Sequence, residues 1–493
     1  MAPEQVTGPP FELRIAQADW VRLHHHLFPG DHDEHAAVLL CGMATSARSH
    51  RLLVREVVCA EDDVSYLPGT RGYRQLTGEF VTHLIRRSKD EKLIYLAVHN
   101  HGGSDSVSFS ATDLGSHERG YPTLLGLTGL PVGAVVLAER AVAGDIWLPD
   151  GSRHPLSRTV IIGGSPATLT PEPQRASPAI QGRYDRQSLL YGEAGQRILG
   201  QAKVAIVGAG GVGMLLVQTL ARLGVGTLVI IDPDRVDPTN LPRLPEATRA
   251  DAMEWLDRPS RRPAVRALAR RLARHKVQVA RRIARRADDA VAVEAIVGDV
   301  ADDHTARLIT DSDFVFLAAD TMLARDVVNQ IAYQFLIPTA QVGSKVVADS
   351  ETGHIHDIFS VVRTLGNRPG CLRCNGLIDL RRLGEESIGN SEQVRNQRYV
   401  NEPEVHAPSV ITLNAVGAGW AADQFMQYMV GLHALPTDFQ VIRTGFEDRV
   451  PTPVALQEPN ADPDCHVCGS GRWSAFARGD QQELPTRVAV SGR

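Results

Sequence analysis

Residues 204–213 read Val-Ala-Ile-Val-Gly-Ala-Gly-Gly-Val-Gly. The four apolar residues are typical of a buried parallel strand, and a helical pattern begins directly after the glycines. Glycines at such a turn let backbone N–H groups approach phosphate oxygens at the N-terminus of the helix. The candidate nucleotide-loop residues are Gly208, Gly210, Gly211 and Gly213. The stretch therefore predicts an α/β domain of the doubly wound, Rossmann-like type.

Two further apolar runs, Leu228–Ile231 and Phe314–Leu317, read as parallel strands of the same sheet. Asp232 follows the first run and stands nineteen residues past Gly213, where an acid can hold the hydroxyls of a ribose. A dinucleotide-dependent dehydrogenase would show the same fingerprint. The glycine turn by itself therefore leaves the nucleotide undecided.

Charged and polar residues around the glycine turn distinguish between these possibilities. The flanking sequence reads Tyr-Asp-Arg-Gln at 184–187, Asp-Pro-Asp at 232–234 and Asn-Leu-Pro-Arg at 240–243. A hydride-transfer enzyme has no need for these charges. Over roughly residues 184–470, the combination resembles the superfamily of ubiquitin-activating enzymes and their bacterial relatives of the ThiF and MoeB type, which adenylate sulfur-carrier proteins.

This resemblance implies an ATP site built from residues that follow the first two strands. Asp232 would hold the ribose, with Asp234 beside it in the cofactor site. Asn240, Arg243 and Lys276 would contact the phosphates. Cations are needed there because negative charge develops on the pyrophosphate leaving group when a carboxylate attacks the α-phosphorus.

The resemblance also implies a metal ion and a second subunit. Asp320, which follows the strand Phe314–Leu317, would hold Mg²⁺. Arg186 resembles the arginine that family members insert into the site of the partner subunit, which implies a homodimer. An adenylation domain over 184–475 is the resulting expectation.

A second group of polar residues lies in the first 160 residues. Apolar runs there read as strands of an α+β domain over 11–160. The expected strands are Ala36–Leu40, Leu52–Val58, Leu93–Val98 and Val132–Leu137. His99 and His101 follow one of these strands and project to the same face, so both imidazoles can reach one metal ion. With Asp113 they supply three ligands and leave a position for water, as in a catalytic zinc site.

These residues resemble the JAMM/MPN family of zinc isopeptidases and deubiquitinases, whose pattern is a Glu, His-x-His, a spacer and Ser-x-x-Asp. The resemblance implies that Glu34 is the general acid/base and that Ser110 helps to stabilise the tetrahedral oxyanion. The spacer between His101 and Ser110 has eight residues where the familiar pattern has seven, and Gly102 replaces the usual proline. A degenerate, metal-free domain is the alternative.

Four of the six cysteines form two Cys-x-x-Cys pairs. Cys371 and Cys374 make one pair, and Cys465 and Cys468 make the other. Four thiolates on two short turns predict tetrahedral structural zinc, and related activating enzymes carry such a site. A redox-active disulfide is the alternative.

The remaining expectations come from the length and composition of the chain and from the positions of its glycine and proline residues. A chain of 493 residues with a net charge of -5 predicts at least two domains, and its bulk charge points neither to nucleic acid nor to a membrane. No window approaches about 18 apolar residues, so we expect a cytoplasmic protein. Glycine and proline predict a linker over 161–183. Twelve Arg or Lys residues and no acid between Arg258 and Arg286 predict a basic helical insertion over about 245–285.

The crossover loop expected between about Glu385 and Pro408 contains no cysteine, although many relatives pass the acyl group to one there. Cys41 and Cys59 lie in strand-like runs of the first domain. The acyl group is therefore expected to reach a separate acceptor, such as a conjugating-enzyme-like protein, or a hydroxyl such as Ser387 or Ser391.

Together these patterns predict an enzyme that adenylates the C-terminal carboxylate of a ubiquitin-like protein with ATP and Mg²⁺, fused to a zinc peptidase that processes or deconjugates it. The setting would be a bacterial ubiquitin-like conjugation system. The alternatives are activation of a sulfur-carrier protein for thiocarboxylate formation in cofactor or cysteine synthesis, and a non-catalytic scaffold of two degenerate enzyme folds.

Overall fold

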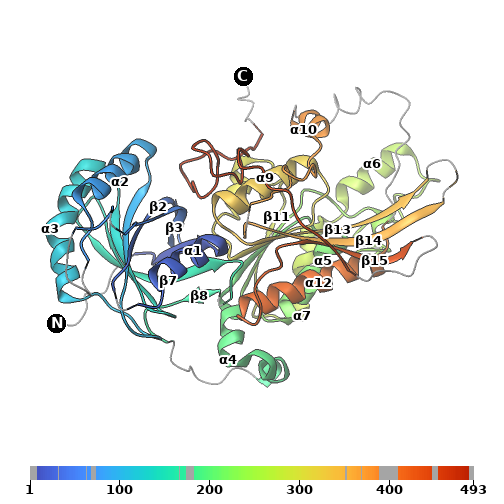
Figure 1. Cartoon of the computed structure of the whole chain (residues 1–493). Helices are drawn as coiled ribbons and strands as arrows, with labels where there is room; N and C mark the ends of the chain where they lie inside the picture. Colours follow the sequence, from blue (N-terminus) through green and yellow to red (C-terminus); the bar gives the residue numbers. More distant parts are fainter. Residues whose placement is uncertain are drawn as a thin grey trace. The chain divides into compact units, whose positions relative to one another are not determined.

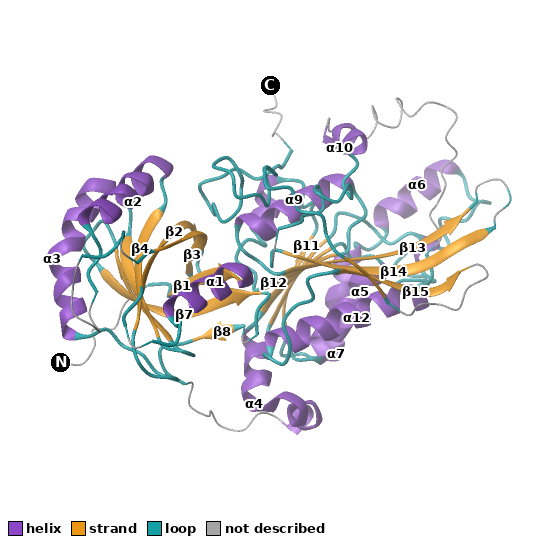
Figure 2. Cartoon of the chain, viewed as in Figure 1, coloured by secondary structure: helices purple, strands orange, loops and turns teal. Residues whose placement is uncertain are grey.

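The chain folds into two compact units, each containing an eight-stranded sheet of described strands (Figures 1 and 2). The computed structural model describes residues 8–31, 33–62, 64–67, 74–165, 167–173, 182–349, 352, 354–367, 369–387, 409–446 and 454–487. Unit 1 contains the described residues of Met1–Ser177 together with Tyr333–Leu336 and Arg472–Glu483, and unit 2 contains the others. Within the described residues, no helix combines the length and apolar content that crossing a bilayer requires.

The sheet of unit 1 has the strand order β1-β3-β2-β4-β5-β6-β7-β8, and β1 also pairs with β7, so the sheet closes on itself. The strands are β1 (Phe11–Ala16), β2 (Ala36–Thr45), β3 (His50–Cys59), β4 (Ile94–Asn100), β5 (Val132–Leu137), β6 (Val142–Trp147), β7 (Arg153–Ile162) and β8 (Thr168–Leu169). The helices are α1 (Gln17–Leu27), α2 (Gly78–Glu91) and α3 (Ala111–Thr128). The four strands expected from the apolar runs are confirmed as β2 to β5, with β4 beginning at Ile94.

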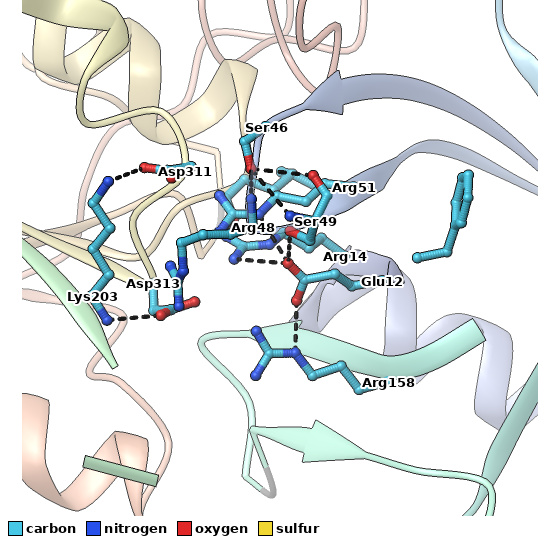
Figure 3. A network of polar contacts seen from close by, with 12 residues as sticks. Glu12, Arg14, Ser46, Arg48, Ser49, Arg51, Arg158, Lys203, Asp311 and Asp313 are labelled. Atoms are coloured by element: carbon cyan, nitrogen blue, oxygen red, sulfur yellow. Dashed lines mark hydrogen bonds and ion pairs between the residues drawn. The ribbon is translucent and has the colours of Figure 1, made fainter. Parts of the chain in front are cut away.

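A buried charge network fixes the first strand of this unit (Figure 3). The carboxylate of Glu12 accepts hydrogen bonds from Ser49 at 2.5 Å, Arg51 at 3.0 Å and Arg158 at 2.7 Å. The Arg14 guanidinium lies 4.0 Å from the same carboxylate. Burial alone would raise the pKa of Glu12, but the surrounding arginines hold that pKa well below its usual range.

Replacing Glu12 by glutamine is expected to lower the free energy of unfolding by about 3–5 kcal/mol near neutral pH, because the arginines lose their buried counter-charge. The folded-state pKa of Glu12 is depressed, so its contribution is present above the unfolded-state pKa of about 4.3 and is lost as the pH falls from there through the folded-state pKa. Urea unfolding at neutral and acidic pH should show a shallower pH dependence for the variant. The exposed Glu172→Gln substitution is the charge-matched control, and equal behaviour of the two variants would contradict the assignment.

Unit 1 is completed by a returning segment, Arg472–Glu483, from far along the chain. Gly479 forms a parallel bridge with Met43, and a Cβ at Gly42 would lie 2.1 Å from the carbonyl oxygen of Ala477, so only glycine fits at position 42. The Arg55 guanidinium donates to the carbonyl of Ser474 at 3.2 Å and also to that of Phe476. The returning segment is therefore part of the structure of unit 1, which the sequence did not predict.

The sheet of unit 2 has the strand order β11-β10-β9-β12-β13-β14-β15-β16. Strands β9 to β13 are parallel to one another, and β14 to β16 continue the sheet in antiparallel pairs. The strands are β9 (Lys203–Val207), β10 (Thr227–Ile231), β11 (Ala292–Ile296), β12 (Phe314–Leu317), β13 (Thr339–Ala348), β14 (Ile355–Leu365), β15 (Phe439–Phe446) and β16 (Ala455–Gln457). Chain order reverses between β9 and β12, as in a doubly wound fold.

Helices cover both faces of this sheet. The helices are η1 (Gly182–Tyr184), α4 (Asp185–Gln201), α5 (Gly211–Arg222), η2 (Pro238–Asn240), α6 (Pro263–Leu272), α7 (Lys276–Ala287), α8 (Asp303–Arg307), α9 (Met322–Gln334), α10 (Leu380–Ser387) and α12 (Ile411–Met429). Helices α5, α7 and α12 lie on one face and α9 lies on the other (Figure 2). The expected Rossmann-like architecture is thus present in this unit.

Two segment expectations need correction. The predicted linker, 161–183, begins inside unit 1, because β7 runs to Ile162 and β8 pairs with it. The predicted basic insertion, 245–285, includes most of α7, whose apolar side chains are buried against α5 and the sheet. Helix α7 is therefore the crossover between β10 and β11, and only the residues before it are inserted.

Four arginines of the basic segment pair with two acids that precede it. Asp257 pairs with Arg266 at 3.2 Å and with Arg270 at 3.1 Å. Asp251 pairs with Arg274 at 2.8 Å and with Arg282 at 2.7 Å. Both carboxylates are only 3% exposed, so these pairs hold the segment together.

Candidate functional site

The glycine turn of unit 2 has a geometry that requires glycine. Gly208 has a φ of 99°, in the left-handed region. A Cβ at Gly213 would lie 1.9 Å from the carbonyl oxygen of Gly208, and one at Gly211 would lie 2.3 Å from Nδ2 of Asn414. A Cβ at Gly210 would meet nothing within 4 Å. The turn is thus closed on its protein side and open at Gly210, where helix α5 begins and a phosphate can approach backbone N–H groups.

Asp232 ties this turn to the end of β10. Its Oδ2 accepts a hydrogen bond from the N–H of Ala209 at 2.7 Å, and its Oδ1 accepts one from the N–H of Asp234 at 2.8 Å. Burial raises the pKa of Asp232, and the nearby Lys276 opposes that shift. Each carboxylate oxygen keeps a lone pair with which to accept a ribose hydroxyl.

Lys276 is brought to this edge although an insertion precedes it in the chain. It is the first residue of α7, and its Nζ donates to Oδ2 of Asp234 at 2.8 Å. Its backbone N–H donates to the carbonyl of Asp234 at 2.9 Å. The lysine side chain is 14% exposed. The structure therefore brings together three of the residues expected in the ATP site, Asp232, Asp234 and Lys276.

Asn240 and Arg243 lie in a short segment against the start of α5. A Cβ at Gly211 would approach the carbonyl oxygen of Arg243 to 3.1 Å. The Asn240 side chain accepts a hydrogen bond from the N–H of Asp237 at 3.3 Å and caps the turn. The Arg243 guanidinium donates to the carbonyl of Thr239 at 3.2 Å. Two of the three residues expected to contact phosphates thus lie in one turn held by local hydrogen bonds.

Asp320 stands at the same edge of the sheet. A Cβ at Gly208 would lie 2.8 Å from the carbonyl oxygen of Ala318, so the turn after β9 touches the turn after β12. Asp320 is exposed two residues further on, and its charge is felt by Arg325. The carboxyl ends of β9 and β12 flank the reversal of strand order, where doubly wound folds bind ligands.

Arg186 stands apart from these residues. It lies in the first turn of α4, is exposed, and forms no hydrogen bond or ion pair with any residue that the structure describes. Leu189 and Leu190, on the same helix, are 88% and 61% exposed. Exposed leucines on a helix beside an unpaired arginine are the features of a surface that another molecule covers.

In unit 1, the three expected zinc ligands converge. Nε2 of His99 and Nε2 of His101 are 3.1 Å apart, and they lie 3.6 Å and 3.4 Å from Oδ2 of Asp113. A tetrahedral zinc ion with bonds of about 2.0–2.1 Å needs ligand separations of roughly 3.3 Å, which these distances fit. Nδ1 of His101 lies 3.1 Å from the carbonyl of Ser108, and a proton there leaves Nε2 free for the metal.

Glu34 and Ser110 are placed differently. Burial raises the pKa of Glu34, and His99, His101 and Asp113 are close enough to act on it, so Glu34 lies beside the proposed ligands. Ser110 is the N-cap of α3, and its hydroxyl donates to Oδ2 of Asp113 at 2.7 Å. In this arrangement the hydroxyl orients a ligand, whereas the predicted oxyanion contact requires it to turn towards a substrate.

A buried histidine behind this cluster was missed at the sequence level. His117 lies one helical turn beyond Asp113 on α3, and its Nδ1 is 2.7 Å from Oδ2 of Asp145. Arg153 and Trp147 donate to the same carboxylate. The spacing of four residues from Asp113 to His117 was the available signal, since it puts both side chains on one face of a helix.

The four cysteines of the two Cys-x-x-Cys pairs gather in unit 2. The sulfur of Cys371 lies 3.7 Å from that of Cys374 and 3.7 Å from that of Cys465, and those of Cys374 and Cys468 are 3.5 Å apart. A disulfide needs about 2.05 Å. A zinc ion with Zn–S bonds of about 2.3 Å needs sulfur separations of roughly 3.8 Å, so the cluster fits structural zinc.

We expect purified protein to contain about two zinc ions per chain, because two ligand clusters have suitable geometry. The Cys371→Ser variant should retain about one and unfold at a lower temperature, since a structural zinc contributes directly to folding. Elemental analysis and thermal unfolding measure both effects. Cys59→Ser, which changes a cysteine outside both clusters, is the control. Unchanged zinc content in Cys371→Ser would contradict the assignment.

Three of the residues considered as acyl acceptors are described, two cysteines of unit 1 and one serine of α10. Cys41 is fully buried in unit 1, and burial raises its pKa far above its usual range. Cys59 is partly buried in the same unit. The Ser387 hydroxyl donates to the carbonyl of Leu383 at 2.7 Å within α10. Ser391 and most of the expected crossover loop lie outside the described residues.

Comparison with known proteins finds a family match for the second part of the chain. The sequence profile of the ThiF family matches residues 184–467. The sulfur carrier protein ThiS adenylyltransferase of Bacillus subtilis (strain 168) is 33% identical over 159 residues, which cover 32% of this chain and 42% of that protein. The molybdopterin-synthase adenylyltransferase of Escherichia coli (strain K12) is 30% identical over 158 residues, covering 32% and 55%. The chain spans about half the length of the curated relatives it matches.

Solved structures give a weaker similarity. Escherichia coli MccB with ATP has 21% identity and a TM-score of 0.41, covering 59% of this chain and 75% of that one. The complex of MccB with MccA-N7isoASN has 19% identity and a TM-score of 0.43, covering 59% and 76%. At these scores the two structures add nothing to the functional assignment.

Proposed function

The chain belongs to the ThiF family, and from this premise we propose that unit 2 adenylates the C-terminal carboxylate of a small ubiquitin-like carrier protein with ATP. The observation that carries the proposal is the meeting of Asp232, Lys276 and the turn before Asp320 at the open glycine turn. Curated relatives act on sulfur carriers of the ThiS type and on molybdopterin synthase, which favours a sulfur carrier as substrate over a ubiquitin-like conjugation system.

In the proposed reaction, a carboxylate oxygen of the carrier forms a bond to the α-phosphorus of ATP. The bond between the α-phosphorus and its bridging oxygen breaks, and pyrophosphate leaves with the electron pair. Asp320 would hold a Mg²⁺ ion that offsets charge on the leaving group. Lys276 and Arg243 would neutralise phosphate oxygens, while Asp232 orients the ribose.

A carrier-dependent exchange assay tests the proposal. The sulfur carrier ThiS of Bacillus subtilis and a ubiquitin-like protein ending in Gly-Gly are the two probes, and labelled pyrophosphate should exchange into ATP only when a carrier is present. A sulfide donor then distinguishes the two candidate pathways, because sulfur transfer yields a thiocarboxylate and conjugation yields isopeptide-linked products. Absence of exchange with both carriers would contradict the proposal and favour the alternative of a non-catalytic scaffold.

We also propose that Arg186 completes the ATP site of a partner subunit in a homodimer. Its exposed position and the exposed Leu189 and Leu190 support this proposal. Arg186→Ala and Asp320→Ala homodimers should each be inactive in pyrophosphate exchange. Co-expressed chains carrying one substitution each should recover roughly a quarter of the wild-type rate, because about half of the dimers would be heterodimers and one of the two sites in each would be intact. Recovery requires that the arginine act across subunits, and no recovery would show that it acts within its own chain.

A second function is proposed for unit 1, zinc-dependent cleavage of a peptide or isopeptide bond. His99, His101 and Asp113 would hold the zinc ion, and Glu34 would take a proton from the attacking water. Zinc supplies the polarisation of that water and of the scissile carbonyl. The ligand separations and the placement of Glu34 support the proposal.

A further inference from the structure

Two partly buried arginines of unit 2 lie close enough to act on each other, and neither forms an ion pair with a described residue. Arg325 is in the first turn of α9, and Arg363 is on β14. The Nε atoms of both are buried and have no hydrogen-bond partner. Within the described part of the chain, neither guanidinium lies within salt-bridge distance of a carboxylate. Removing part of a cation from water without an ion pair is costly, so the arrangement favours an anion that is supplied from outside.

The electrostatics agree with this geometry. Burial lowers the pKa of Arg363 to about 10, and the charge of Arg325 contributes to the shift. Burial also lowers the pKa of Arg325, with Asp320 acting against the shift and Arg382 adding to it. Glu386 is close to Arg325, but its Oε2 accepts the N–H of Leu323 at 2.8 Å and so caps α9.

The register of the sheet places this pair relative to the nucleotide edge. Leu317, the last residue of β12, pairs with Gln341, and Gln341 pairs with Arg363. Arg363 therefore lies two strands from the end of β12, on the order of 10 Å away. Its NH1 donates to Oε1 of Gln341 at 2.6 Å, which fixes the guanidinium.

The pair also lies on a defined face of the sheet. The Ser360 hydroxyl donates to the carbonyl of Leu413 at 2.8 Å, so Ser360 points towards α12. Arg363 is three residues further along the strand and points to the opposite face, where α9 lies (Figure 2). The aromatic ring of Phe439 is 5.8 Å from its guanidinium.

We propose that Arg325 and Arg363 bind the C-terminal carboxylate of the carrier's tail and hold it for attack on the α-phosphorus. The inference rests on the proposed adenylation. A carboxylate that approaches a triphosphate meets like charge, and two guanidiniums can offset that repulsion. The phosphates already have Lys276 and Arg243 on the β10 side of the glycine turn, whereas this pair lies on the β13–β14 side. Arg325 and Arg363 are therefore binding residues for the second substrate.

Binding of a labelled peptide that ends in Gly-Gly tests the inference without turnover. Wild-type protein should bind the free carboxylate at least about tenfold more tightly than the same peptide with a C-terminal amide. Arg325→Gln and Arg363→Gln should lose this preference, and Arg381→Gln, an exposed arginine of α10, should keep it. Equal binding of acid and amide by the wild type, or a preference that survives in both variants, would overturn the inference.

Kinetics separate this inference from the proposed reaction. In pyrophosphate exchange, Arg363→Gln should raise the KM for the carrier about tenfold or more and leave the KM for ATP within about twofold. Equal increases in both would show that the pair binds phosphate instead. Absence of exchange in the wild type would count against adenylation and not against the carboxylate preference measured with the peptide.

A stability measurement shows whether the variants fold. Because the wild type holds two repelling, partly buried cations, Arg363→Gln should unfold at a temperature no lower than that of the wild type. Arg363→Lys keeps the charge but not the planar fork, so it should recover only part of the carboxylate preference. A strongly destabilised Arg363→Gln would indicate a structural role and overturn the inference.

Discussion

Replacing Asp320 by alanine is expected to lower carrier-dependent exchange of pyrophosphate into ATP by about a hundredfold to a thousandfold. The carboxylate is exposed beside the turn that touches Gly208, at the edge where the chain order of the sheet reverses. Under the proposed function it holds the Mg²⁺ ion that stabilises the leaving pyrophosphate. Removing it should reduce the rate at saturating ATP far more than it changes the affinity for ATP.

The control for this variant is Asp303→Ala, an exposed acid of α8 that pairs with Arg307 at 2.8 Å. It removes the same charge from unit 2 without touching the glycine turn. Both variants should have the thermal stability of the wild type, because neither side chain is buried. Full exchange activity in Asp320→Ala would remove Asp320 from the proposed site.

Replacing His101 by alanine is expected to abolish both zinc binding by unit 1 and hydrolysis of a carrier fused through its C-terminal glycine to a reporter. Two remaining ligands cannot hold a catalytic zinc ion tightly, and loss of metal removes several kcal/mol of transition-state stabilisation. That loss corresponds to at least about a thousandfold in rate. Elemental analysis should show that the cysteine site of unit 2 keeps its metal.

His83→Ala, at an exposed position of α2, is the matched control for this change. Pyrophosphate exchange should be unaffected in both histidine variants, because the ligand cluster and the glycine turn belong to different units. Cleavage that persists in His101→Ala after treatment with a chelator would exclude a zinc mechanism.

The fold of unit 2 could be predicted from short stretches of its sequence. The run at 204–213 specified a buried strand, a turn that only glycine can make and a helix, because each of these depends on neighbouring residues. The same holds for β4, which contains His99, because the alternation of side chains along a strand made a shared ligand face predictable. The resemblance to a known family predicted the site residues that are far apart in sequence, such as Asp320 and Lys276.

Other features depended on contacts that no local pattern encodes. The basic segment looked like one insertion, but α7 within it is a core helix whose apolar stripe is narrow and bordered by arginines. The repelling pair of Arg325 and Arg363 follows from strand register across β12, β13 and β14. Ser110 matched a catalytic pattern, yet it is also a helix cap, and sequence alone does not choose between the two roles.

The returning segment gives the fusion a property that two domains joined end to end would not have. A gene fragment cut at the linker would encode a front half without Ala477 and Gly479, leaving the edge at Gly42 and Met43 uncovered and Arg55 without its acceptors. Recombination could not replace unit 1 by a foreign domain unless the returning segment at the end of unit 2 also fitted that domain. Loss or replacement of either proposed activity in evolution should therefore proceed by point substitution within the sites, with both halves of the reading frame retained.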